Sequence, residues 1–437
     1  MREVIATRDP FGVRPLYYAR TPELVCSESL EEILAHRDGP LDLDAHAVAD
    51  YLLNGVLSDP EATIYANVRR VPPAHTLLRD ADGNLAVERY WRIPPRAPKP
   101  RPDAVQHLEA TLKQAIADRV HGPAAVVFMS GGVDSTLLAA LTREVRPETQ
   151  LLAGTSVYRT RIADVEEAFA DEAARSIGIP IEKFVLDDYP VLAALEQDVW
   201  TAEPGPLLTA PMTRDIYRQT AEHAPLAVHG HPADAVLSVD LIAYLRGLPP
   251  RTRIAEMIRY TFARRRPPYF YFRPRRRVAR TAVPNWLRVR PETRQQSDDP
   301  LDSASWSSYF EWTHPQFTRA AVEVVYPWCD VRVIEAAREL EPIPWLVDKQ
   351  IAREMLRGRV SDRVRLRKKS FLAGDPWRAD VPDLAIEAAS QFIDPARFRD
   401  ACRTAGAVFD QTLRAVIFES WLRRLPSEAA RLRSVGR

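Results

Sequence analysis

The sequence predicts an α/β protein whose larger part is a doubly wound parallel sheet. Three apolar segments, at 124–129, 151–157 and 182–186, alternate with the helical patterns 136–145 and 163–177. Short apolar runs that alternate with helices are typical of parallel strands buried between two helical layers. The first of these strands runs directly into a glycine-rich loop. Folds of this class bind their ligands at such loops, beyond the carboxyl ends of the strands.

The beginning of the chain follows a different pattern. It contains short β-like pieces such as 16–18 and a helical pattern around 45–53. Residues 93–102 then read Ile-Pro-Pro-Arg-Ala-Pro-Lys-Pro-Arg-Pro, and proline lacks the N–H group that helices and sheets require. We therefore expect an extended linker between a first domain at 1–95 and a second at 103–437.

Composition narrows the class of protein. The 437 residues are enough for two domains, and 60 basic against 59 acidic residues give no bulk attraction to nucleic acid. The cysteines Cys26, Cys329 and Cys402 are widely separated, which fits a reducing compartment better than a disulfide framework. There is no apolar signal region at the start and no apolar run approaching about 18 residues. We expect a cytoplasmic protein without a nucleic-acid or membrane partner.

The loop at 130–135 carries the strongest chemical signal. It reads Ser-Gly-Gly-Val-Asp-Ser between a predicted strand and a predicted helix. Glycines let the backbone approach an anion closely, serine hydroxyls donate hydrogen bonds, and a helix start supplies amide donors. The carboxylate of Asp134 would face phosphates only across a divalent cation, so it is a candidate magnesium ligand. We predict that ATP is bound by Ser130, Gly131, Gly132, Asp134 and Ser135.

This loop lacks the Gly-Lys-Ser/Thr ending of a Walker loop. It resembles instead the SGGxDS loop of ATP pyrophosphatases, which adenylate a substrate and release pyrophosphate. The alternative interpretation is an ordinary Gly-Gly turn between a strand and a helix.

Further segments, taken with the loop, resemble the class B asparagine synthetases and their relatives. Their order and rough spacing match along most of the chain. The resemblance implies a truncated glutaminase-like α+β sandwich domain followed by an ATP pyrophosphatase domain that uses ATP and Mg²⁺. The similar blocks are 8–18 (beginning Arg-Asp-Pro-Phe-Gly), Ser27-Glu28, 72–75 (Pro-Pro-Ala-His), 230–234 (Gly-His-Pro-Ala-Asp, against GEGxD), 326–330 (Tyr-Pro-Trp-Cys-Asp, against PFLD), 349–353 (KxxxR) and 367–371 (Arg-Lys-Lys-Ser-Phe, against an RxKxxF-like close).

The first departure from the family lies at the start of the chain. Glutaminases of this family use an N-terminal cysteine, whereas this chain has Arg2, and roughly the first hundred residues of that domain have no counterpart. We expect glutamine hydrolysis to be absent. Either the chain start is truncated or mis-assigned, or another surface covers the sheet that a missing half-domain leaves open.

The second departure is His231. Asparagine synthetases resemble each other in having glutamate there, and β-lactam synthetases have tyrosine, in the role of handling the proton of the attacking amine. Histidine can do that work because its ordinary pKa lies near neutrality. A different base suggests a different amine. The alternative is a structural histidine that caps a loop beside His229.

The other site residues are charged. Asp134 and Asp234 could together hold magnesium against the phosphates at the edge of the sheet. In relatives the lysine that corresponds to Lys349 stabilises acyl transfer, because an ammonium can follow developing negative charge. Lys369 is predicted to contact ATP or pyrophosphate. The alternative for the cluster of Lys349, Lys368 and Lys369 is a solvated basic face. The roles of three further acidic residues stay open: Glu203, Glu323 and Asp330.

These residues predict adenylation of a carboxylate by ATP, followed by attack of an amine to form an amide. Because glutamine-derived ammonia is not expected, the amine should belong to the substrate. Lasso peptide cyclases, among the relatives, join a peptide's N-terminal amine to an Asp or Glu side chain. A peptide or small amino-acid substrate is then expected, and the lasso resemblance adds a leader-binding protein and a protease as partners.

One further segment and two other functions complete the expectations. The Arg-rich, aromatic region at 246–290 could receive a peptide, with Trp286 offering apolar contact, or could simply be helices with solvated arginines. The protein could instead be an asparagine synthetase proper, or a non-catalytic binding subunit. The complete phosphate loop and both aspartates argue against a non-catalytic subunit.

Overall fold

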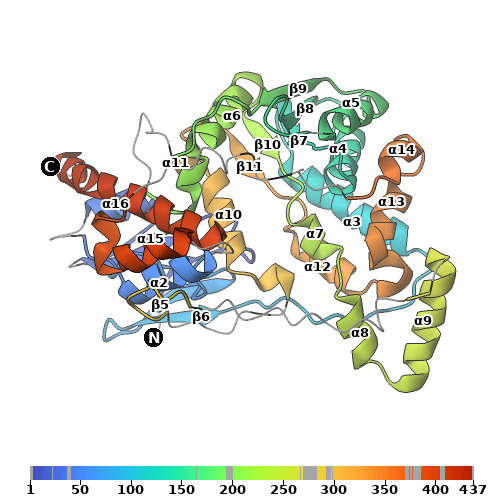
Figure 1. Ribbon diagram of the computed structural model, residues 1–437. Coiled ribbons are helices and arrows are strands. Elements are labelled where there is room, and N and C mark those ends of the chain that lie inside the picture. Colours follow the sequence, from blue (N-terminus) through green and yellow to red (C-terminus); the bar gives the residue numbers. More distant parts are fainter. Residues whose placement is uncertain are drawn as a thin grey trace.

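The protein folds into two lobes joined by a long extended segment (Figure 1). One lobe is built on a five-stranded sheet in the order β11-β10-β7-β8-β9, and the other holds two three-stranded sheets, β1-β5-β6 and β3-β2-β4. The computed structural model describes residues 3–21, 23–36, 41–163, 165–192, 200–265, 267–268, 283–291, 297, 299–369, 374, 376, 385–403 and 409–435.

The five-stranded sheet is parallel throughout, as the sequence predicts. Ala124 pairs with Gln150 across β7 and β8, and Leu226 pairs with Glu323 across β10 and β11. Helices cover both faces, because alternate residues of a strand point to opposite sides. Its strands are β7 (Ala124–Phe128), β8 (Gln150–Val157), β9 (Ile181–Val185), β10 (Leu226–Val228) and β11 (Glu323–Val325).

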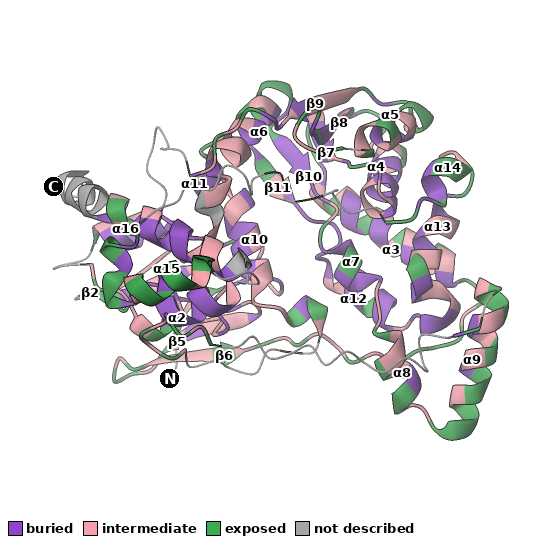
Figure 2. Cartoon of the chain, in the orientation of Figure 1, coloured by how far each residue is buried: buried purple, intermediate pink, exposed green. Residues whose placement is uncertain are grey.

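The two faces of β7 show how the sheet is buried. Ala125 and Val127 pack in the main core with α3 and α4, whereas Phe128 packs on the other face against Tyr217 of α6, with ring centroids 5.6 Å apart. Figure 2 shows buried residues on the strands and on the inner sides of these helices. The helices of this lobe are α3 (Ala104–Arg119), α4 (Val133–Val145), α5 (Glu166–Ile177), α6 (Ala210–His223), α7 (Ala233–Val236), α8 (Leu241–Gly247), α9 (Pro250–Arg264), α12 (Val331–Arg338), α13 (Gln350–Met355) and α14 (Asp362–Arg365).

Two predicted helices have different boundaries. α4 begins at Val133 rather than at 136, so Asp134 lies in its first turn, where the helix N-terminus points toward the site. α5 begins at Glu166 rather than at 163.

The predicted linker at 93–102 contains no helix or strand, but it is bound to the second lobe. The backbone N–H groups of Ala97 and Lys99 donate to the carbonyl oxygens of Arg338 and Glu339, at 3.1 and 2.8 Å.

The first lobe begins with antiparallel pairings. The β-like piece expected at 16–18 belongs to β2, and the helix expected at 45–53 is α2. Asp44 caps α2 by accepting hydrogen bonds from the backbone N–H groups of His46 and Ala47. The elements are β1 (Glu3–Thr7), β2 (Tyr17–Thr21), β3 (Glu23–Ser27), β4 (Val68–Arg70), β5 (His75–Arg79), β6 (Leu85–Arg89), α1 (Leu30–Ala35) and α2 (Ala45–Asn54), with α10 (Ser305–Thr313), α11 (Pro315–Thr318), α15 (Pro395–Arg403) and α16 (Phe409–Val435) beside them.

The two ends of the chain share one hydrophobic core. Val48 and Leu52 of α2 are buried with Phe418 and Trp421 of α16. Figure 1 shows α16 lying along the first lobe. The helices of the first lobe are thus covered by another part of the same chain. We call this cluster, which runs from Tyr17 to Leu425, the shared core.

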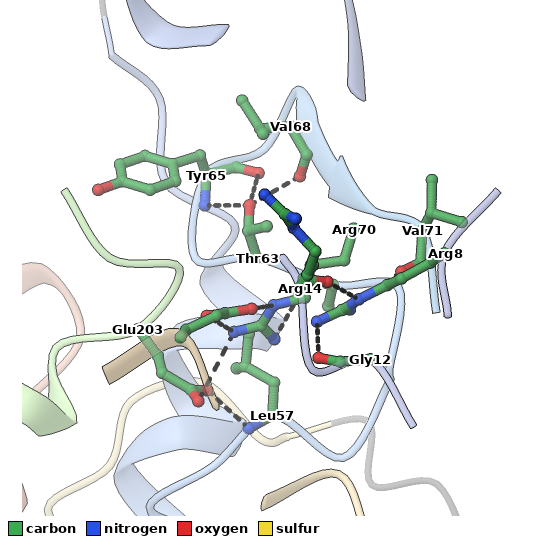
Figure 3. A network of polar contacts seen from close by, with 12 residues as sticks. Arg8, Gly12, Arg14, Leu57, Thr63, Tyr65, Val68, Arg70, Val71 and Glu203 are labelled. Atoms are coloured by element: carbon green, nitrogen blue, oxygen red, sulfur yellow. Dashed lines mark hydrogen bonds and ion pairs between the residues drawn. The ribbon is translucent and has the colours of Figure 1, made fainter. Parts of the chain in front are cut away.

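A buried charge network joins β4 of the first lobe to α10 and to the segment before α6 (Figure 3). Arg70 of β4 donates from Nε and Nη2 to both carboxylate oxygens of Glu311 on α10, at 2.8 and 2.9 Å, and lies 3.7 Å from Glu203. Burial raises the pKa of Glu203 to about 7, although Arg70 opposes that rise. Arg8, nearby, donates to the carbonyl oxygens of Gly12, Arg14 and Val71.

The Arg-rich region falls only partly within the described residues. Arg259 of α9 pairs with Glu256 and Glu341, so its charge is neutralised rather than simply solvated. Trp286 is 3% exposed and packs in the shared core against Phe398, so the expectation that it contacts a peptide is wrong. Arg2, 266, 269–282, Ser370 and Phe371 lie outside the described residues. Within the described ranges, no helix is long and apolar enough to cross a membrane.

Candidate functional site

The predicted phosphate loop leaves β7 and enters α4 with a left-handed residue at its first glycine. Gly131 has φ +68°, and a Cβ atom there would lie 2.5 Å from the backbone nitrogen of Ala170. The loop is also cross-linked, since the N–H of Ser130 donates to the hydroxyl of Ser135 at 3.3 Å. Only glycine fits at 131, because any side chain would collide with the backbone of α5.

Replacing Gly131 with alanine should therefore destabilise the protein by about 2 kcal/mol or more, because backbone strain adds to a backbone collision. Gly178 offers a matched control: its φ is +75°, but a Cβ there would meet nothing within 4 Å. Urea unfolding of the two alanine variants should show the larger loss at Gly131. Equal losses would mean that the collision contributes nothing.

Three predicted charged residues meet at the carboxyl edge of the sheet. Asp134 comes from α4, Asp234 from α7, and Lys349 from the turn before α13. The Lys349 ammonium forms ion pairs with both carboxylates, and Lys369 pairs with Asp234 at 2.9 Å. Asp134, Asp234 and Lys349, which lie at least 100 positions apart in sequence, thus form one charged centre beside the phosphate loop.

The ionisation of the two aspartates differs. Burial raises the pKa of Asp134, and the neighbouring Lys349 only partly offsets this. Burial also acts to raise the pKa of Asp234, but hydrogen bonds from Lys349 and Lys369 outweigh it and the pKa is lowered. An added cation would favour the charged form of both carboxylates.

The carboxylates of this centre are suitable ligands for a magnesium ion that also binds phosphate oxygens. One or two carboxylates plus phosphate oxygens are the ligands that Mg²⁺ ordinarily takes. Oδ1 of Asp134 is buried and has no hydrogen-bond partner among the residues that the structure describes, so an oxygen remains for an ion. No cluster of three His, Cys, Asp or Glu side chains suited to a metal occurs in the described part of the chain, so the phosphates would have to supply further ligands.

The turn that presents Lys349 is held in an unusual conformation. Asp348 and Lys349 both have positive φ, 50° and 54°. The Arg353 guanidinium donates to the Asp348 carbonyl at 2.9 Å, and Arg264 forms an ion pair with the Asp348 carboxylate. Consecutive left-handed residues persist only where their surroundings enforce them. The arginine of the KxxxR block therefore acts as a clamp, a role that the sequence did not reveal.

A second arginine fixes the phosphate loop itself. Arg367 donates to the carbonyl oxygen of Ser130 at 3.1 Å and pairs with Glu166 at the same distance. Its guanidinium lies 4.3 Å from the centre of the Phe169 ring. The sequence placed Arg367 in a family block but assigned it no role, because its contacts are to residues about 200 positions away.

A cavity of about 240 Å³ opens beside the loop and the charged centre. His231 lines it, together with the aromatic ring of Tyr309. Nδ1 of His231 is 2.9 Å from the Tyr309 hydroxyl. His231 keeps an exposed edge, but the desolvation of the rest of its ring lowers its pKa, so the neutral form is favoured at pH 7. The cavity is lined by Phe128, Met129, Ser130, Gly132, Asp134, Ser135, Gly154, Thr155, Ser156, His229, Gly230, His231, Asp234 and Tyr309.

The three acidic residues left open by the sequence lie away from this cavity. Glu203 is in the buried charge network, and Glu323 is exposed at the start of β11. Asp330 caps α12; burial acts to raise its pKa, but hydrogen bonds from Arg332 and Arg119 lower it to about 2. The environments of Glu203 and Asp330 indicate structural roles.

The strand-loop-helix and the doubly wound parallel sheet define an ATP pyrophosphatase domain. Residues 107–423 match the family model described as asparagine synthase, and residues 1–91 match a glutamine amidotransferase domain. The chain belongs to the asparagine synthase family, and this membership implies the use of ATP.

Curated relatives agree with this assignment. Asparagine synthetase [glutamine-hydrolyzing] 1 of Bacillus subtilis (strain 168) is 26% identical over 235 residues, which cover 52% of this chain and 36% of the relative. A putative asparagine synthetase [glutamine-hydrolyzing] of Mycobacterium bovis is 26% identical over 254 residues, which cover 53% and 37%. The chain thus spans little more than a third of the length of these relatives.

Among solved structures, the U34-tRNA thiolase NcsA of Methanococcus maripaludis is 14% identical, and the match covers 60% of this chain and 70% of that one. Its TM-score of 0.28 is too low to support an inference.

Proposed function

We propose that this protein is an ATP-dependent carbon–nitrogen ligase that adenylates a carboxylate and then forms an amide. The observation that supports this most directly is the meeting of Lys349 with Asp134 and Asp234 beside the phosphate loop. A binding subunit would gain nothing from two carboxylates turned toward an anion site, because such charges are costly unless a cation joins them to the phosphates.

In the first step a substrate carboxylate oxygen attacks the α-phosphorus of ATP, and pyrophosphate leaves. The loop amides and the hydroxyls of Ser130 and Ser135 bind the phosphates. Asp134 and Asp234 would hold Mg²⁺, which neutralises phosphate charge when bound. The ammonium of Lys349 can follow the negative charge that develops on the leaving group.

In the second step an amine attacks the acyl carbon of the adenylate, the bond from that carbon to the AMP oxygen breaks, and AMP leaves. The amine nitrogen must lose a proton as the new C–N bond forms. We assign this proton to His231, because it lines the cavity and its lowered pKa favours the neutral ring. Lys349 stabilises the oxyanion of the tetrahedral intermediate.

The second step should therefore depend on pH through His231. Because the neutral ring is the active form, amide formation should rise with pH through the pKa of His231 and then level off. Burial lowers that pKa, so the rate should increase at a pH below 6.5, the ordinary pKa of histidine. The measurement is the amide-forming rate against pH for the wild type and His231→Gln. We expect the amide-forming rate of the variant to be lower by about 10²-fold or more. Its rate should also no longer increase with pH over the range in which His231 loses its proton.

We propose that the amine belongs to the substrate, and that the reaction is macrolactam formation in a lasso peptide. Two features support this. Histidine stands where asparagine synthetases have glutamate, and the wall beside it is aromatic: the ring centroids of Trp306 and Tyr309 lie 6.3 and 4.7 Å from that of His231. A leader-binding protein and a protease would then be partners. The alternative, asparagine synthesis, is favoured by the names of the curated relatives.

The experiment measures pyrophosphate release from ATP with Mg²⁺ and each candidate acceptor, with product masses determined in parallel. Aspartate plus ammonia is compared with a precursor peptide encoded near the gene. Loss of one water from the peptide supports macrolactam formation, whereas asparagine supports the alternative. Asp134→Asn serves as the control that should release no pyrophosphate in either case. Release at the wild-type rate by this variant would contradict the proposed site.

A further inference from the structure

A row of four polar side chains runs from the cavity into the interior. The Tyr309 hydroxyl lies between two histidines, 2.9 Å from Nδ1 of His231 and 3.2 Å from Nδ1 of His229. Nε2 of His229 is in turn 2.8 Å from the hydroxyl of Tyr217. The imidazole of His229 thus has hydrogen-bonding hydroxyls at both of its nitrogens.

All members of the row are uncharged at neutral pH. Burial, with a smaller effect from His231, lowers the pKa of His229 to about 3. Burial also raises the pKa values of the Tyr309 and Tyr217 hydroxyls. Each hydroxyl therefore keeps one hydrogen to donate, and each imidazole has one N–H and one lone pair. In such a row each group donates to one neighbour and accepts from the other. The direction of the hydrogen bond at one end therefore fixes the direction of all the others.

The inner end of the row sets this direction. The Thr313 hydroxyl forms a hydrogen bond with the hydroxyl of Tyr217 and another with that of Tyr326, and it donates to the carbonyl oxygen of Phe310 at 3.0 Å. A carbonyl can only accept, so the single hydrogen of Thr313 is committed, and its two lone pairs can accept from both tyrosine hydroxyls. Tyr217 then accepts from Nε2–H of His229, whose Nδ1 accepts from Tyr309. Tyr309 in turn accepts from Nδ1–H of His231.

We propose that His229 and Tyr309 are positioning residues that hold His231 as its Nδ1–H tautomer, so that the lone pair of Nε2 is free for the amine. Among the described residues, Nε2 of His231 has no hydrogen-bond partner. A free neutral histidine favours the opposite tautomer, with hydrogen on Nε2, which could not accept a proton there. The inference rests on the proposed role of His231 as the base.

The row also accounts for proton transfer without a net charge entering the interior. The attacking amine gives its proton to Nε2 of His231 as its lone pair forms the C–N bond and AMP leaves with its electron pair. The imidazolium that results donates from Nδ1 to the Tyr309 hydroxyl, which His229 orients by accepting its hydrogen. A charge-assisted hydrogen bond is stronger than the neutral one it replaces, so Tyr309 favours the protonated state of the second step.

The test is histidine-selective ¹⁵N NMR of the full-length protein, which reads the tautomer without any substrate. Wild-type His231, assigned by its absence in His231→Gln, should show the Nδ1–H pattern. Tyr309→Phe should convert it to the Nε2–H pattern, and Tyr217→Phe should do so in part. Tyr189→Phe is the control, because the Tyr189 hydroxyl binds Asp215 and lies outside the row. An Nε2–H tautomer in the wild type would overturn the inference.

Kinetics then separate this inference from the proposed function. Tyr309→Phe should keep ATP–pyrophosphate exchange, which reports adenylation, but slow amide formation on the order of 10-fold. If the tautomer changes as expected and amide formation does not slow, His231 is not the base and the proposed second step fails. If amide formation slows while the tautomer stays the same, the positioning role fails and the base survives. Equal unfolding midpoints for Tyr309→Phe and Tyr189→Phe would show that the fold is intact.

Discussion

Replacing Lys349 with glutamine should abolish nearly all amide formation while leaving the fold intact. Glutamine keeps most of the side-chain volume but removes the ammonium that pairs with Asp134 and Asp234. Loss of one preorganised group that stabilises developing negative charge typically costs about 10²–10³-fold in rate. We expect a loss at the upper end of that range, because the same ammonium is assigned to the leaving pyrophosphate and to the oxyanion.

The measurement compares pyrophosphate release and amide formation for Lys349→Gln and for Lys368→Gln. Lys368 is exposed and belongs to the same basic stretch, so it controls for a general change in charge. Its variant should retain nearly full activity. A loss at Lys349 of less than about 10-fold, or equal losses for the two variants, would favour the solvated basic face and remove Lys349 from the chemistry.

Replacing Arg70 with methionine should cause the largest loss of stability. Arg70 is 2% exposed and is bound through two nitrogens by Glu311. Without it, the buried carboxylates of Glu311 and Glu203 would lose their shared cation. Removing one partner of a buried ion pair typically costs about 3–5 kcal/mol, because the remaining charge is left uncompensated.

Urea unfolding of Arg70→Met against Arg69→Met tests this expectation. Arg69 is the exposed neighbour on the same strand, so its replacement should change the free energy of unfolding by about 0.5 kcal/mol or less. Adding Glu311→Leu to Arg70→Met should recover part of the loss, because the unpaired charge is then gone. Equal stability of the two single variants would show that the network does not stabilise the fold.

The parts of the fold that could be predicted are those with local signals. The apolar run at 124–129 and the glycine pair behind it specify a strand and a tight loop within a few residues. The start of α4 was missed because Val133, Asp134 and Ser135 read as a continuation of that loop. The shared core was not predicted at all, because no periodicity in α2 indicates that its partner is α16.

Some residues of the candidate site could likewise be predicted from the sequence, and others could not. Asp134, Asp234 and Lys349 could be grouped only through the family resemblance, since no spacing in the sequence brings positions 134 and 349 together. The roles of Arg353, Arg367 and Tyr309 were missed because hydrogen bonds between distant residues leave no repeating pattern. His229 did carry a signal, because a second histidine two positions before His231 was visible in the sequence.

The shared core has a consequence for synthesis on the ribosome. Tyr17 and Leu425, which belong to the same core, are separated by nearly the whole chain. At about 5–20 residues per second, tens of seconds pass between the emergence of α2 and that of α16. During that interval the core around α2 lacks the buried residues that α16 supplies, such as Phe418 and Trp421. The first lobe therefore completes its core only after α16 has been made, and nascent chains should depend on chaperones until then.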